Sequence, residues 1–142
     1  METYIDYIAQ GVLKIRTTKW IEVEELDTST QIAAADIEKN IIYTKKSIND
    51  EKLMFFAIAH ELRHLWQNEH KNEMIKQFNE EKLDINKYND QEAEIDANAF
   101  ATAIMVAVFN VKPLFYEFDD KIKEKIYEKA KKIVEEFESD IS

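Results

Sequence analysis

The sequence has no cysteine, one glycine and one proline among its 142 residues. The absence of cysteine excludes disulfide bonds, a thiol nucleophile and a cysteine-ligated zinc finger. A chain built mainly of hairpins and tight turns needs more glycine and proline, because both residues supply the backbone angles of turns. The composition therefore predicts long helices with a little sheet, and the length predicts a single domain over residues 1–142.

Basic residues and long hydrophobic runs are also scarce. The 19 Lys and Arg residues against 29 Asp and Glu residues give a formal net charge of -10. An acidic surface repels phosphate backbones, so we expect no nucleic-acid partner. The most apolar segment, 97–111, is shorter than the roughly 20 residues that span a bilayer. Since the N-terminus also lacks the basic region of a signal peptide, we expect a cytoplasmic protein without membrane contact.

The spacing of hydrophobic residues predicts an α+β fold. Helical periodicity is found in four segments, at residues 2–13, 49–70, 89–110 and 114–139. Strand-like patterns are found in three, at residues 20–24, 31–35 and 41–44. Turn-forming residues separate the last two strands and favour an antiparallel hairpin, and residues 79–88 form a polar connector. We expect a small three-stranded sheet packed against the helices at 49–70 and 89–110 and against a long C-terminal helix.

The C-terminal segment repeats apolar residues at steps of three and four. One interpretation is a surface helix that packs a single stripe on the core. The other is a seam for a partner helix or a dimer, because the spacing is close to a heptad.

The segment His60-Glu61-Leu62-Arg63-His64 indicates a metal site. Two histidines four apart on a helix point in nearly the same direction, so both imidazoles can bind one ion. A glutamate beside the first histidine can face a metal-bound water and act as a general base. Two of the three histidines in the chain lie in this segment. The pattern predicts a zinc site with His60 and His64 as ligands and Glu61 as the catalytic residue.

Such a site needs a third protein ligand, and two regions compete for the role. His70 has the spacing of a third histidine, but that pattern needs glycine where this chain has Gln67. In a continuous helix His70 points away from the direction of His64 and lies about 9 Å further along, so we expect it at the surface. The competing region is a carboxylate cluster containing Glu92, Glu94 and Asp96.

The carboxylate cluster also carries a family resemblance. The segment Glu94-Ile95-Asp96-Ala97-Asn98-Ala99-Phe100-Ala101 follows the histidine motif by 30 residues. The two motifs together resemble the gluzincin metallopeptidases, and within them the ImmA/IrrE-like family. The resemblance implies a zincin-like minimal domain in which Glu94 completes a site for one Zn²⁺ per chain. It also implies that Asn98, one turn after Glu94, accepts a hydrogen bond from a ligand histidine.

The other polar residues near these motifs receive separate interpretations. Glu92 is expected to cap the helix by reaching back to Asn89, and with Asp96 it forms a reserve ligand pair. Asp96 is otherwise expected to be a solvated helix charge, and Arg63 to form a surface ion pair. Four residues remain equal candidates for stabilising the oxyanion: Tyr43, Tyr88, Tyr116 and His70.

The predicted function is zinc-dependent hydrolysis of a peptide or protein substrate, with Glu61 as base and later as proton donor. Family resemblance adds a regulator or repressor protein as a substrate class. An extended peptide is expected to pair with a sheet edge, if one of the hairpin strands borders the cleft. The alternative is a catalytically silent or latent zinc-binding module that acts as a protein-interaction partner.

Overall fold

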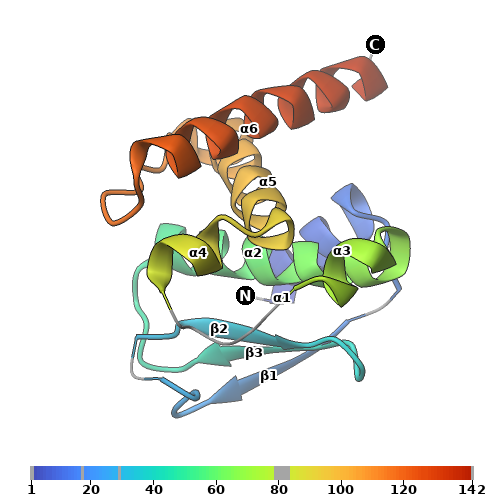
Figure 1. The fold of residues 1–142 in the computed structure, drawn as a ribbon. Helices are drawn as coiled ribbons and strands as arrows, with labels where there is room; N and C mark the ends of the chain where they lie inside the picture. The colour runs from blue at the N-terminus through green and yellow to red at the C-terminus, as the bar shows by residue number, and fades with distance from the viewer. Residues whose placement is uncertain (1, 17, 29, 79–83, 142) are drawn as a thin grey trace.

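The computed structural model describes residues 2–16, 18–28, 30–78 and 84–141, and its fold is α+β as predicted. In Figure 1 the sheet lies on one side, and helix α2 runs across it. Helix α5 crosses α2, and the long C-terminal helix α6 lies over α5 on the side away from the sheet. This order of layers places α5 between two helices, which buries most of its surface.

The sheet contains strands β1 (Lys19–Val23), β2 (Ala33–Asp36) and β3 (Ile41–Lys45) in the order β1-β3-β2. β2 and β3 pair antiparallel, which confirms the hairpin, and β1 pairs parallel with β3. Asn40 ends the hairpin turn at a φ of 58°, a left-handed conformation that asparagine tolerates. Because β2 is the last strand in the order β1-β3-β2, it is an edge strand of the sheet.

The N-terminal residues form a short helix α1 (Glu2–Asp6) that continues as a π-helical segment, η1 (Tyr7–Val12). Helix α2 (Glu51–His70) matches its predicted range closely. Its first turn is capped by Asp50, whose side chain accepts a hydrogen bond from the Leu53 backbone N–H at 3.1 Å. The apolar face of α2 packs into the main core, with Phe55, Ile58 and Leu62 almost fully buried. A short helix α3 (Asn72–Lys76) follows.

The start of the next long helix differs from the prediction. Helix α5 (Glu92–Phe109) begins at Glu92 with Gln91 as its N-cap, so the expected capping box from Asn89 is absent. A separate short helix, α4 (Ile85–Asn89), takes up residues that were expected to be a polar connector. The rest of that connector, 79–83, lies outside the described residues. α5 ends at Phe109, and its C-cap Asn110, three residues before the proline, has a left-handed φ of 54°.

Helix α6 (Asp120–Ile141) begins six residues later than predicted, because Phe115 and Phe118 lie in the preceding loop and stack on each other. Its apolar stripe packs against α5 and is buried at Ile122, Ile126, Ala130 and Ile133. The stripe therefore completes the core of this chain, and the structure gives no support to a dimer seam there. None of the helices in the described part of the chain is long and apolar enough to cross a membrane.

Candidate metal centre

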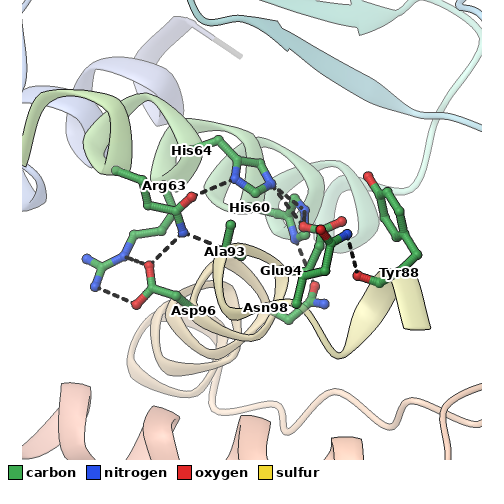
Figure 2. Close-up of polar contacts among 10 residues, drawn as sticks. His60, Arg63, His64, Tyr88, Ala93, Glu94, Asp96 and Asn98 are labelled. Atoms are coloured by element: carbon green, nitrogen blue, oxygen red, sulfur yellow. Dashed lines mark hydrogen bonds and ion pairs between the residues drawn. The ribbon is translucent and has the colours of Figure 1, made fainter. Parts of the chain in front are cut away.

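His60, His64 and Glu94 converge on one point between α2 and α5. The two Nε2 atoms lie 3.2 Å apart, and Oε2 of Glu94 lies 2.9 Å from Nε2 of His60 and 3.0 Å from Nε2 of His64. One potential ligand atom from each residue lies within 4.8 Å of the others. Figure 2 shows the two rings and the carboxylate directed toward one another from the two helices.

Helix α5, which packs against α2, carries small buried residues. Ala97 and Ala101 of α5 are fully buried and face neighbouring elements without the bulk of longer side chains. Glu94 is only 4% exposed. A buried carboxylate is costly unless a cationic or hydrogen-bonding partner compensates for the lost water. Glu94 therefore requires partners such as the two histidines.

The cluster shifts the ionisation of its members. Burial lowers the pKa of His60, but the nearby Glu94 carboxylate outweighs it and raises that pKa to about 9. Burial also lowers the pKa of His64, but the hydrogen bond between His64 and Glu94 outweighs burial, so the pKa of His64 is raised. Burial raises the pKa of Glu94, yet the charges and hydrogen bonds of both histidines hold it well below its usual range. The metal-free cluster thus pairs an ionised carboxylate with a protonated histidine.

The chemistry of this donor set fits a zinc ion. Two imidazole nitrogens and one carboxylate oxygen are ligands that Zn²⁺ takes in three-residue sites. The two Nε2 atoms face each other at 3.2 Å, an arrangement that needs a proton or another cation between them. A divalent cation would satisfy both nitrogens and the buried carboxylate together.

The other ring nitrogen of each histidine also has a partner. Nδ1 of His60 lies 2.8 Å from Oδ1 of Asn98, and Nδ1 of His64 lies 2.8 Å from Oε1 of Gln67. The family resemblance led us to expect Asn98 beside a histidine. The sequence reasoning missed Gln67 in this position, although its place three residues after His64 on one helix was a usable signal.

The predictions for Arg63 and Asp96 were wrong. Both residues were expected at the surface, but they form a buried ion pair in which Nε of Arg63 lies 2.7 Å from Oδ2 of Asp96. Lys129 of α6 lies 3.0 Å from the other carboxylate oxygen. Burial raises the pKa of Asp96, but the Arg63 guanidinium lowers it to about 2. The predictions failed because α5 packs on the face of α2 that carries Arg63 (Figure 2).

A cleft with a volume of about 360 Å³ opens beside the cluster. It is lined by the three converging residues, by Glu61, by Tyr88 and by residues of β2 and the loop before it. A larger cleft of about 900 Å³ shares several of these lining residues and continues along β2 toward α3. Four carboxylate residues and one lysine line this larger cleft: Glu25, Asp27, Asp36, Glu38 and Lys76.

The four residues that were candidates for stabilising the oxyanion lie in different places in the structure. Only Tyr88 lines the cleft that contains the histidines, whereas Tyr43 lines the larger cleft. Tyr116 is 82% exposed and lines a cleft beside α6. His70 is the last residue of α2, and its ring packs near Trp66 in a half-exposed position, as expected of a surface residue. Glu92 is also exposed and is not part of the metal-ligand group.

The comparisons with known proteins agree with this arrangement. The family model Peptidase_M78, described as the IrrE N-terminal-like domain, matches residues 15–139. The match covers most of the chain, so the protein is a metallopeptidase-like domain. It belongs to the IrrE N-terminal-like family, as the sequence motifs indicated. No curated protein and no solved structure matches the chain significantly.

Proposed function

We propose that this protein is a zinc-dependent peptidase whose metal is held by His60, His64 and Glu94. The observation that carries the proposal is the convergence of their three ligand atoms, within 4.8 Å, at the wall of an open cleft. Membership of a peptidase family supports a peptide or protein substrate. The resemblance to ImmA/IrrE-like proteins supports a regulator protein as the particular kind of protein substrate.

Glu61 is the proposed general base. It follows His60 directly in the chain, lines the same cleft, and lies close enough to contribute to the raised pKa of His60. A zinc ion at this site would supply acidification of water and polarisation of the substrate carbonyl. The Glu61 carboxylate would accept the proton of the attacking water and deliver it to the nitrogen of the leaving amine. A positioned general base of this kind contributes about 10²–10⁴-fold to the rate.

Tyr88 is the proposed donor to the oxyanion that develops on the substrate carbonyl. Its ring packs on Phe78 with centroids 5.6 Å apart, and both residues line the cleft. Glu94 lines the same cleft, and Figure 2 shows the hydroxyl end of Tyr88 directed away from α5. A tyrosine hydroxyl in such a place can donate a hydrogen bond to negative charge in the transition state.

The substrate is proposed to bind as an extended chain along β2. This strand is at the edge of the sheet, and its residues Ala34 and Ala35, together with Ile37 just after it, line both clefts. An edge strand offers backbone N–H and C=O groups that can pair with an extended peptide. Because the larger cleft continues from the smaller one, a peptide of several residues has room on one side of the scissile bond.

The metal content of purified protein tests the site. The variants are Glu94→Gln, which keeps the shape of the side chain, and the exposed Glu92→Gln as a matched control. We expect one zinc per chain in the wild type and in Glu92→Gln, and a loss of tight binding in Glu94→Gln. Absence of zinc in the wild type, even after titration with zinc, would refute the proposal.

Hydrolysis is tested separately with Glu61→Gln. We expect this variant to retain zinc and to lose cleavage of a denatured protein or a peptide library by at least about 10²-fold. Equal cleavage by Glu61→Gln and wild type would refute the role of Glu61. Zinc binding without cleavage by the wild type would instead support the silent or latent zinc-binding module.

A further inference from the structure

Gln67 occupies an unusual position for an uncharged polar residue. Its side chain is fully buried between α2 and α5, where each of its two polar atoms has a partner. Nε2 lies 2.9 Å from the backbone oxygen of Ala93 and 2.8 Å from Oδ2 of Asp96. Oε1 lies 2.8 Å from Nδ1 of His64. A buried amide in contact with three groups must match the donor or acceptor character of each.

The partners determine which way the amide faces. A backbone carbonyl only accepts hydrogen bonds, and so does an ionised carboxylate. Asp96 is kept ionised by Arg63 and Lys129, which contact it from two sides. The amide NH₂ must therefore face Ala93 and Asp96, which leaves its oxygen toward His64. In the reverse orientation two pairs of acceptors would face each other at less than 3 Å.

This orientation has a consequence for the histidine. Only the protonated Nδ1 of His64 can donate to the amide oxygen, so the neutral ring carries its lone pair on Nε2. Nε2 is the atom that faces His60 and Glu94. The amide thus selects the tautomer in which the lone pair points to the cluster.

We propose that Gln67 is a positioning residue that fixes His64 in its metal-binding tautomer, and that Asp96 in turn fixes the orientation of Gln67. The inference rests on the proposed metal role of His64. It extends the site outward through a continuous chain of contacts, from His64 to Gln67, Asp96 and finally Lys129 on α6. Through this chain of contacts Lys129 on the C-terminal helix supports the geometry of the site.

The first test compares zinc affinity in Gln67→Leu and in the wild type. Leucine has a similar size but cannot accept a hydrogen bond from the Nδ1–H group of His64, and loss of such a partner lowers metal affinity by about 10–100-fold. Zinc dissociation constants are measured by competition with a chromophoric chelator, and melting temperatures of the metal-free proteins are measured in parallel. Thr44→Val is the matched control, because Thr44 is also buried and hydrogen-bonded, to the Trp20 indole at 2.8 Å.

We expect both variants to have lower melting temperatures, but only Gln67→Leu to have weaker zinc binding. A change in zinc affinity below about threefold in Gln67→Leu, with tight binding by the wild type, would overturn the inference and leave the proposed function standing. Failure of the wild type to bind zinc would overturn the proposed function itself. Equal weakening in Thr44→Val would mean that general destabilisation causes the effect, and this too would overturn the inference.

The second test follows the Nδ1 proton of His64 directly by NMR of ¹⁵N-labelled, zinc-loaded protein. We expect a slowly exchanging Nδ1–H signal in the wild type and its loss or rapid exchange in Gln67→Leu. Asp96→Asn supplies a further variant, since an asparagine can donate to the Gln67 oxygen and lets the amide turn round. We expect this variant to broaden or remove the same signal. An unchanged His64 signal in both variants would contradict the proposed orientation.

Discussion

The buried ion pair between Arg63 and Asp96 gives a sharp prediction, because the sequence alone suggested a surface pair. The side chains are 11% and 2% exposed, and the guanidinium contacts both carboxylate oxygens, at 2.7 and 3.1 Å. The guanidinium also lies over the Trp66 ring, 3.6 Å from its centroid. The substitution Arg63→Met keeps much of the packing volume and removes the charge, so it isolates the loss of the pair.

Removing one partner of a buried pair costs about 3–5 kcal/mol, because the other charge stays buried without compensation. Lys129 and Gln67 still contact Asp96, so we expect the lower end, about 3 kcal/mol. The entropy of unfolding is roughly 2.1 cal/mol/K per residue, which for a chain of this length is about 0.3 kcal/mol/K. The melting temperature of Arg63→Met should therefore fall by about 10 °C.

The assay is thermal and urea unfolding of the metal-free protein, followed by circular dichroism. Lys46→Met is the control, because Lys46 pairs with Glu24 at 3.4 Å and both side chains are more than half exposed. An exposed pair contributes about 0–1 kcal/mol, so the control should change little. Similar losses in the two variants, or a loss below about 1 kcal/mol in Arg63→Met, would refute the assignment of a buried, stabilising pair.

Three further predictions concern the site. The pKa of His60 is raised to about 9, so zinc must displace a proton from this residue at neutral pH. Below pH 9 the protonation of His60 alone should therefore weaken zinc binding about tenfold for each pH unit. Chelator competition at pH 7 and pH 8 measures this, and pH-independent affinity would contradict it. Tyr88→Phe should lower kcat by about 10²–10³-fold without loss of zinc, whereas the exposed Tyr116→Phe should match the wild type. Since carboxylates outnumber lysine in the larger cleft, peptides with Lys or Arg beside the scissile bond should be cleaved faster than acidic ones at low salt, and equal rates would refute this.

The elements that could be predicted are those whose signals are local. The antiparallel hairpin follows from two apolar runs around a turn, and α2 follows from helical periodicity after a capping aspartate at position 50. The start of α5 could not be predicted in the same way. Asn89 and Glu92 match a capping box, but Asn89 ends the short helix α4 instead, and the N-cap is Gln91, which has no side-chain capping bond. The start of α5 is therefore not marked by a local capping signal.

The same distinction applies to the site. The two histidines are one turn apart on a single helix, so their proximity is a property of local geometry. The partner of Arg63 lies 33 residues away on another helix, and the sequence does not show which face of α2 meets α5. One indication was available: α5 is made largely of small and apolar residues, and an acidic residue in such a segment is rarely buried without a cationic partner. Asp96 could have been read in this way.

The two buried carboxylates of α5 differ in the kind of partner that compensates them. Asp96 is held by the guanidinium cation of Arg63. Glu94 is held by two histidines, whose protons can be exchanged for a metal ion. Because the Arg63 pair is a second contact that anchors α5 to α2, the helix can stay in place while the cation beside Glu94 changes. The metal-free protein should therefore keep the fold of the site, and zinc should bind without a large rearrangement of α5.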